Sequence, residues 1–482
     1  MTADANFIDP RRVTITPDSL RALMEVIREL YLSDARPWVI GYSGGKDSTA
    51  TVQAVWYAIK ELPREQLKKS IYVIASDTLV ETPVIVDHLT RTLDQINSAA
   101  QAAGLPFSAH KVVPDPDDTF WVNLIGRGYP APYNKFRWCT DRMKIRPATK
   151  FIVDKVTKFG EVTLILGARK AESASRAQVM NARRKVGDRL SRHCDIPGAW
   201  VFTPLEDWQT EDVWMYLLST PAPWGGRNRD LVTMYKNAQA GECPLVVDKS
   251  TPSCGSSRFG CWTCTVVTKD KSMEAMIDGG QDWMEPLLAF RNWLATTADP
   301  AVKPKIREHR RRSGRVEFLG EGAKRKIKWG PYTLTFRQEI LRKLLQAQQA
   351  VRKDGPDRNA VLITEPELLR IRQLWQFAEG DWQDSLPRIY NEVVGSSLTY
   401  EADDWSGMGS LEAEVLATVA ASHQIPDGLM RELFDAERDQ HGMNRRSRIY
   451  ERIDAILKKD WISRDEVFRS VGVVDTADEE EE

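Results

Sequence analysis

The chain has 482 residues, a formal net charge of −1 and 42% hydrophobic residues. Its apolar content excludes an intrinsically disordered protein, its length predicts about three domains, and its charge excludes a chain that is basic throughout. No apolar run approaches the roughly 20 residues of a membrane-spanning helix, and the polar N-terminus does not resemble a signal peptide. We therefore expect a cytoplasmic protein with no membrane partner, whose six cysteines stay reduced.

The first half of the chain alternates apolar strands with helices. A helix expected over residues 18–32 precedes a buried strand over 37–41, and a helix over 49–60 leads to a strand over 71–75. The pattern continues with two helices and a strand, over 83–103, 151–158 and 162–166. This alternation predicts an α/β domain with a parallel sheet and helices on both faces, in which ligands bind at the carboxyl ends of the strands.

The organisation of the chain changes near residue 221. Glycine, proline and cysteine become frequent there, which predicts an irregular segment, and helical periodicity returns from about residue 335. We therefore expect an N-terminal helical segment, an α/β domain, an irregular segment and a mainly α-helical region with an acidic tail, over 1–36, 37–220, 221–334 and 335–482.

A glycine-rich loop, Ser43-Gly44-Gly45-Lys46-Asp47-Ser48, follows the first strand at once. Its glycines let backbone N–H groups approach phosphate oxygens, and the next helix offers free N–H groups and the positive end of its dipole. The two serines add hydroxyl donors and Lys46 adds positive charge. The spacing is not that of a Walker A motif. The loop predicts a phosphate site, with a plain glycine turn as the alternative.

The loop resembles that of the PP-loop ATP pyrophosphatases. Within that superfamily, the chain most resembles the group of adenylylsulfate and phosphoadenylylsulfate reductases. Further motifs follow in the family's order: Asp77 with Glu81-Thr82-Pro83, Arg137-Trp138-Cys139-Thr140, Gly167-Ala168-Arg169 with Glu172-Ser173, and Pro204-Leu205 with Asp212. The resemblance implies an adenine nucleotide alpha hydrolase-like fold that binds ATP with Mg²⁺ and breaks its α–β phosphate bond. It implies these nucleotide-binding residues: Ser43, Gly44, Gly45, Lys46, Asp47, Ser48, Asp77, Gly167, Arg169 and Glu172.

The resemblance also implies that Lys46 and Asp47 are catalytic. For two of the motif residues, an ordinary structural role is an alternative to nucleotide binding. Asp77 is also typical of a turn, and Arg169 is also compatible with an ordinary surface position.

Four cysteines, Cys243, Cys254, Cys261 and Cys264, lie within 22 consecutive residues. Four thiolates in an irregular segment can ligate zinc or an iron–sulfur cluster. Zinc ribbons usually offer two C-x2-C pairs, whereas only the last two cysteines here form one. The irregular spacing favours a 4Fe-4S cluster, with zinc and unligated cysteines as alternatives.

The other two cysteines, Cys139 and Cys194, lie apart from this group. Either fits an ordinary buried thiol. Cys139 stands in sequence beside Arg137, Arg142 and Lys144, which predicts a lowered pKa and a thiolate that carries sulfur in catalysis.

The cysteine spacing resembles the DndC family, the sulfurtransferases of bacterial DNA phosphorothioation, as do Gly330-Pro331-Tyr332-Thr333-Leu334 and Pro387-Arg388-Ile389-Tyr390. The resemblance weakens after about residue 400. It implies that ATP adenylates a DNA backbone phosphate and that sulfur replaces a non-bridging oxygen. It implies a 4Fe-4S cluster on the four cysteines, and as partners DNA, a cysteine desulfurase and other phosphorothioation subunits. A related single-strand phosphorothioation system would look similar.

A basic stretch over 303–328 agrees with a DNA substrate, because lysine and arginine neutralise phosphates. Trp329, Tyr332 and Phe336 lie nearby and are of the type that stacks on bases. The alternative is a solvated charged face with core aromatics.

Three other functions remain open. A reductase of adenylylsulfate or phosphoadenylylsulfate needs a C-terminal redox cysteine, and no cysteine follows Cys264 here. A PP-loop tRNA thiolase is a second possibility. The third is a non-enzymatic DNA-binding scaffold in which nucleotide only switches conformation.

Overall fold

The computed structural model describes residues 12–182, 185–186, 189–238, 260–321, 325–400, 409–438 and 448–471. These residues form two compact units. Of the described residues, the first unit holds those up to 118 and those from 134 to 288, and the second holds 119–133 and those from 289 onward. Within the described part of the chain, no helix is long and apolar enough to cross a membrane.

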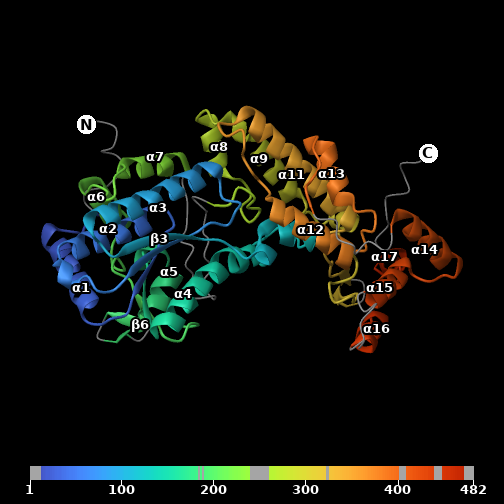
Figure 1. Ribbon diagram of the computed structural model, residues 1–482, viewed down its shortest axis with the longest axis horizontal. Helices are drawn as coiled ribbons and strands as arrows, with labels where there is room; N and C mark the ends of the chain where they lie inside the picture. Colours follow the sequence, from blue (N-terminus) through green and yellow to red (C-terminus); the bar gives the residue numbers. More distant parts are fainter. Residues whose placement is uncertain are drawn as a thin grey trace. The chain divides into compact units, whose positions relative to one another are not determined.

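The first unit is built on a seven-stranded sheet with the order β3-β2-β1-β4-β7-β6-β5. Figure 1 labels β3 and β6 of this sheet. Five neighbouring strands run parallel: β1 (Trp38–Gly41), β2 (Ile71–Ser76), β3 (Phe107–Val112), β4 (Val162–Ile165) and β7 (Ala199–Phe202). Two short strands extend one edge in antiparallel pairing, β5 (Lys185–Val186) and β6 (Leu190–Arg192). The sheet confirms the predicted fold class.

Helices cover both faces of this sheet. Along β1, Trp38 and Ile40 belong to one apolar core while Val39 belongs to another, because successive side chains of a strand point to opposite faces. The first core also takes in α1 (Pro17–Leu32), α2 (Lys46–Lys60), α3 (Pro83–Ala103), α6 (Thr210–Ser219) and α7 (Asn228–Ala238). The second takes in α4 (Arg146–Phe159) through Ala148 and Ile152.

Shorter helices complete the first unit. They are the 3-10 helices η2 (Arg64–Gln66), η3 (Pro116–Asp118), η6 (Lys170–Glu172) and η7 (Asp282–Met284), the π-helix η5 (Thr140–Ile145), and the α-helices α5 (Ala174–Ala182) and α8 (Lys271–Asp278). Because α2 begins at Lys46, three residues before the helix predicted from sequence, the second half of the glycine-rich loop forms the first helical turn.

The second unit is mostly helical, as predicted for the C-terminal region. Its elements are the π-helix η4 (Val122–Gly126), α10 (Lys303–Ile306), α11 (Leu334–Asp354), α12 (Glu365–Ala378), α13 (Ser385–Val394), α14 (Ser410–Ser422), α15 (Asp427–Arg438), α16 (Ile449–Leu457), α17 (Arg464–Ser470) and the two-stranded β8 (Phe318–Leu319) and β9 (Lys326–Ile327). Helix α9 (Glu285–Thr296) spans the boundary between the units.

Residues 119–133 belong to the second unit although they follow the third strand of the first. Hydrogen bonds fix this segment: the indole of Trp121 donates to the carbonyl of Leu362 over 2.6 Å, and the indole of Trp375 donates to the carbonyl of Ile125 over 2.9 Å. The buried guanidinium of Arg337 donates to the carbonyl of Gly126 over 2.9 Å. The sequence-based division did not anticipate this exchange between the units.

Candidate nucleotide-binding site and cysteine region

The glycine-rich loop joins the end of β1 to the start of α2. Gly44 has a φ of 71°, in the left-handed region that favours glycine. The backbone N–H of Ser43 donates to the hydroxyl of Ser48 over 3.1 Å, and that hydroxyl donates to the carbonyl of Gly45 over 3.0 Å. Gly45 is the N-cap of α2 and offers no side-chain acceptor to the first helical turn. The loop therefore presents backbone donors of the kind that bind phosphate.

Lys46, Asp47 and Arg169 form an ion triad beside the loop, in which the two cations are buried and the side chain of Asp47 is 18% exposed. The Nζ atom of Lys46 lies 2.5 Å from Oδ2 of Asp47, and Nε of Arg169 lies 2.6 Å from Oδ1. Burial alone would raise the pKa of Asp47, but the two cations hold that pKa below its ordinary value. Two positive charges against one negative charge leave the triad with a net positive charge, which suits a polyphosphate ligand.

Arg169 ties the loop to the segment that follows β7. Its Nη1 donates to the carbonyl of Trp208 over 3.1 Å, and its Nη2 donates to Oγ1 of Thr210 over 3.5 Å. Its neighbour Gly167 packs so closely that a Cβ there would lie 2.8 Å from the carbonyl oxygen of Asp47. The side chain of Arg169 is only 2% exposed, so the alternative of a surface arginine is wrong.

Asp77 and Glu172 lie on the segments after β2 and β4. The Oδ1 atom of Asp77 accepts from the backbone N–H of Leu79 over 2.8 Å, and its Oδ2 lies 3.2 Å from Nζ of Lys111. Asp77 thus has the turn role that the sequence left open, and its contact with a nucleoside stays a prediction. Glu172 pairs with Arg176.

Sequence reasoning missed Tyr235, on α7. The backbone N–H of Lys46 donates to the Tyr235 hydroxyl over 3.0 Å. The ring centre of Tyr235 lies 5.8 Å from Nζ of Lys46, and the ring packs edge-on against Trp214 at 5.1 Å. No local sequence signal marks this tyrosine, because it meets the loop from 189 residues away.

The turn from Cys261 to Cys264 packs against the segment after β2. Cys261 and Glu81 form an isolated antiparallel bridge, and Oγ1 of Thr78 lies 3.3 Å from Sγ of Cys261. The backbone N–H of Cys264 donates to the carbonyl of Cys261 over 3.0 Å. Two of the four predicted cluster ligands therefore lie close to the segment that carries Asp77.

Cys139 is the N-cap of η5 and lies near this turn. Burial, and after it the thiol of Cys264, raise the pKa of Cys139 to about 11, and Lys144 offsets only part of this rise. Arg142, which was expected to stabilise a thiolate, pairs with Asp118 instead. The predicted lowering of this pKa is therefore wrong, because desolvation outweighs the cations. The second lone cysteine, Cys194, is exposed.

Of the four predicted cluster ligands, Cys261 and Cys264 lie within the described residues, and Cys243 and Cys254 lie outside them. Among the described residues, no group of three or more His, Cys, Asp or Glu side chains is arranged to hold a metal ion. Burial raises the pKa of Cys261 well above its ordinary value. Cys261 and Cys264 are thiols brought together by a tight turn, which fits soft-metal ligation by a C-x2-C pair.

In the basic stretch over 303–328, several arginines bind groups of their own unit. Arg307 is 8% exposed, and its Nε donates to the carbonyl of Gly330 over 2.6 Å. Arg311 donates to the carbonyl of Trp329 over 2.5 Å, and Arg315 lies 3.3 Å from Asp460. Lys305 and Lys326 are exposed on the same stretch.

Two of the three aromatic residues predicted to stack on bases are core residues. Tyr332 is 1% exposed, and its hydroxyl bonds with Thr297 over 2.7 Å. Phe336 is 8% exposed and packs against Tyr332. Trp329 packs edge-on against Phe468. Base stacking by Tyr332 and Phe336 is therefore wrong, since their faces are covered by their own unit.

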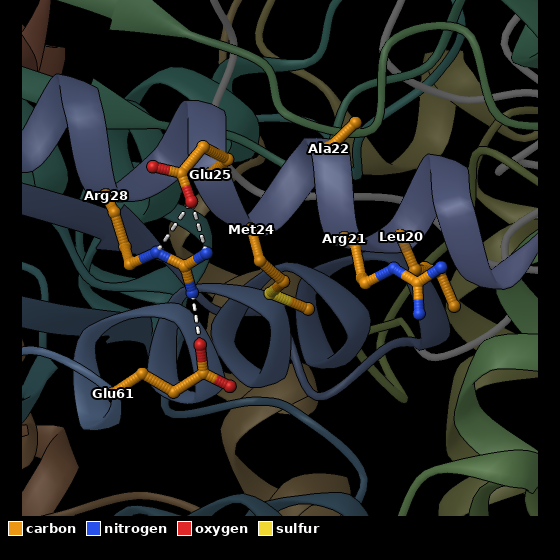
Figure 2. A pocket seen from close by; sticks show the side chains of 7 residues that line it. All are labelled: Leu20, Arg21, Ala22, Met24, Glu25, Arg28 and Glu61. Carbon is orange, nitrogen blue, oxygen red and sulfur yellow. Dashed lines mark hydrogen bonds and ion pairs between the residues drawn. The ribbon is translucent and has the colours of Figure 1, made fainter.

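A surface pocket of about 550 Å³ lies on α1 and the end of α2 (Figure 2). Arg28 bridges Glu25 and Glu61 there, so its charge is already compensated. Glu61 follows the last turn of α2, whereas the loop precedes its first turn, about 22 Å away along a helix of this length. This pocket is thus separate from the nucleotide site.

Two comparisons with protein families bear on the site. Residues 37–267 match the phosphoadenosine phosphosulfate reductase domain. The chain contains a phosphoadenosine phosphosulfate reductase-like domain. Residues 411–458 match a second family, described as a small protein found in certain Dnd DNA modification systems. The first match covers the sheet, the loop and all six cysteines, and the second covers α14 to α16.

Individual relatives are more distant. An uncharacterized protein of Methanocaldococcus jannaschii, MJ0066, is 28% identical over 198 residues, which are 41% of this chain and 35% of that protein's length. Phosphoadenylyl-sulfate reductase from Candida auris is 15% identical over 46% of this chain and 93% of its own, with a TM-score of 0.26. The U34-tRNA thiolase NcsA of Methanococcus maripaludis is 13% identical over 46% of this chain and 75% of its own, with a TM-score of 0.28. Such low TM-scores do not establish a shared overall fold.

Proposed function

We propose that the protein is an ATP-dependent sulfurtransferase that inserts sulfur into the DNA backbone. The observation that carries this proposal is the pairing, in one chain, of a phosphoadenosine phosphosulfate reductase-like domain with a domain found in Dnd DNA modification systems. In this proposal the first domain supplies the nucleotide site for sulfur chemistry, and the presence of the second supports DNA as the acceptor. Neither match alone selects the acceptor.

The first step of the proposed reaction is adenylation. The backbone donors of the loop and the Lys46 ammonium hold the β- and γ-phosphates of ATP. A non-bridging oxygen of a DNA phosphate attacks the α-phosphorus, the α–β bond breaks, and pyrophosphate leaves with that bond's electron pair. Mg²⁺ neutralises the phosphates when bound. Asp47 is already paired with two cations and acts in this step by fixing Lys46 and Arg169.

The second step replaces oxygen by sulfur. A sulfur nucleophile attacks the adenylated DNA phosphorus, and AMP leaves with the displaced oxygen. We place the sulfur donor at Cys139, because this thiol lies beside the Cys261–Cys264 turn and η5 follows it directly. Because its pKa is raised, Cys139 is a protonated thiol before it receives sulfur. We expect a cysteine desulfurase to load it as a persulfide, and a persulfide ionises more readily than a thiol. After the attack, the outer sulfur joins the DNA phosphorus to Cys139 through an S–S bond. Two thiol equivalents, such as free cysteine, then reduce this bond with two electrons, which releases the phosphorothioate and the Cys139 thiol and leaves a disulfide of the reductant.

Cys261 and Cys264, with Cys243 and Cys254, would hold a 4Fe-4S cluster. Such a cluster would supply electron transfer, because four cysteine ligands leave no iron with an open coordination position. Anaerobically purified protein should show the broad visible absorbance of such a cluster, and Cys261→Ser should remove it. Stoichiometric zinc with no visible absorbance would contradict the cluster.

The activity is tested by supplying the full chain with ATP, Mg²⁺, DNA, a cysteine desulfurase and cysteine. We expect release of pyrophosphate and AMP, and phosphorothioate dinucleotides on mass spectrometry of the digested DNA. Other subunits of the modification system are added in a second series, because the C-terminal domain links the chain to them. Release of phosphate without any pyrophosphate would overturn the proposal.

A second candidate function, reduction of adenylylsulfate or phosphoadenylylsulfate, is favoured by the family match over residues 37–267. The same preparation, given either compound and a thiol reductant, separates the two functions. Sulfite formation without DNA modification would select the reductase.

A further inference from the structure

The start of α2 already carries a hydrogen-bond partner. The first N–H groups of a helix have no acceptor within the helix, and this is why phosphate binds there. In this structure the N–H of Lys46, the first residue of α2, donates to the Tyr235 hydroxyl over 3.0 Å. A Cβ on Gly45 would also lie 3.0 Å from this hydroxyl oxygen. The tyrosine oxygen thus occupies space directly against the loop backbone.

We propose that Tyr235 is a further residue of the phosphate site and that its hydroxyl stands in for a phosphate oxygen, which ATP must displace. This inference rests on the proposed nucleotide function of the loop. A phosphate oxygen and a phenolic oxygen compete for the same N–H, because only one acceptor can lie on the near-linear path that a strong hydrogen bond prefers. Binding of the β- or γ-phosphate therefore requires the hydroxyl to leave.

The surroundings of the ring favour displacement over a fixed structural contact. Tyr235 is partly exposed, whereas the ring that it packs against, Trp214, is 3% exposed. The Lys46 ammonium lies 5.8 Å from the tyrosine ring centre, within cation–π range, so the ring offsets part of the charge that ATP would neutralise. Both contacts of Tyr235 with Lys46 are ones that a polyphosphate replaces with stronger, charged partners.

The decisive variant is Tyr235→Phe, which keeps the ring and removes only the hydroxyl. Because the hydroxyl competes with the ligand, we expect the Kd of α,β-methylene-ATP to fall about three- to tenfold, the range that one neutral hydrogen bond supplies. Tyr57→Phe is the matched control on α2: its hydroxyl donates to the carbonyl of Pro221 over 2.9 Å, and its loss should leave the Kd unchanged. Isothermal titration of the full chain with Mg²⁺ gives both values.

The direction in which the Kd changes shows whether the Tyr235 hydroxyl competes with phosphate or binds it. A higher Kd in Tyr235→Phe would show that the hydroxyl binds phosphate, and an unchanged Kd would show that it does not compete; either overturns the inference while leaving nucleotide binding intact. A wild-type chain that binds neither the analogue nor ATP would instead overturn the proposed function itself, and the inference with it. Hydrogen exchange provides a second measure: the analogue should speed exchange of amides in 228–238 in the wild type but not in Tyr235→Phe.

Discussion

The glycine-rich loop and the basic stretch over 303–328 both bring positive charge to a site predicted to meet phosphate, yet they use it differently. At the loop, Lys46 and Arg169 converge on the carboxylate of Asp47 and leave a net positive charge beside the backbone N–H groups at the start of α2. In the basic stretch, Arg307 and Arg311 donate to backbone carbonyls of their own unit. An ordered sequence motif therefore predicts which charged side chains gather at a ligand site. A high density of basic residues does not, because such residues can instead bind carbonyl groups of their own unit.

The largest effect should come from Asp47→Asn. This change leaves Lys46 and Arg169 buried without their counter-ion, which typically costs about 3–5 kcal/mol of the free energy of unfolding. Urea denaturation followed by circular dichroism measures it. A loss below 1 kcal/mol would mean that the triad is no tighter than the surface pairs of the basic stretch.

The same triad predicts that the free energy of unfolding decreases at acid pH. Because the folded pKa of Asp47 lies below its unfolded value of about 3.9, its contribution is present above pH 4 and is lost as pH falls through the folded pKa. The difference in unfolding free energy between wild type and Asp47→Asn should therefore shrink from pH 6 to pH 3. A difference that does not change over this range would contradict the ionised carboxylate.

Lys46→Ala should lower the rate of pyrophosphate release about 100-fold, because it removes a preorganised positive charge from the site where the phosphates bind. The fold should survive, since the helix start at Gly45 and Lys46 is made by the backbone. A coupled pyrophosphate assay measures the rate, and Lys60→Ala at the other end of α2 is the control. An equal loss in both variants would break the contrast between the loop and other lysines.

Arg307→Met should destabilise the protein by about 1–3 kcal/mol, because it leaves the buried carbonyl of Gly330 without its donor. Lys305→Met, at an exposed position of the same stretch, should stay within about 0.5 kcal/mol of wild type. Thermal unfolding compares them directly. Equal stability of the two variants would mean that Arg307 is as available to DNA as Lys305.

The smallest effect on stability should come from Lys305→Ala combined with Lys326→Ala. If these exposed residues meet DNA phosphates, binding weakens alike for all sequences, and the slope of log K against log salt falls by about 2. Fluorescence anisotropy over a salt series measures the slope. A slope equal to that of the wild type would remove the basic stretch from the DNA interface.

The sheet was largely predictable because its central strands, β1 and β2, are continuous apolar runs that match strands buried on both faces. Strand β3 was missed because Ser108, His110 and Lys111 break that run at the edge of the sheet. The motif residues of the loop were predicted because their spacing is local. Arg169 was predicted by its motif, but its burial depends on contacts that no motif states.

The rest of the site depends on distant contacts. Tyr235 meets Lys46 only after the chain has folded, and nothing around it in the sequence differs from an ordinary helix. The pKa of Cys139 was predicted in the wrong direction because sequence neighbours show charge but not burial. Aromatic residues beside basic ones predict a DNA surface, whereas Tyr332 and Phe336 fill the core of the second unit.

The exchange of residues 119–133 between the units also has a consequence for synthesis on the ribosome. Trp121, Leu124 and Ile125 are fully buried in the finished protein, yet the partners of this segment include Trp375, 250 residues later than Ile125. At about 5–20 residues per second, those partners are made roughly 12–50 s afterwards. The strands of the first unit can pair before then, while the apolar segment over 119–133 stays without its partners from the second unit. Slowed translation between 133 and 375 should thus increase aggregation of the nascent chain, and a trigger-factor-type chaperone should relieve it.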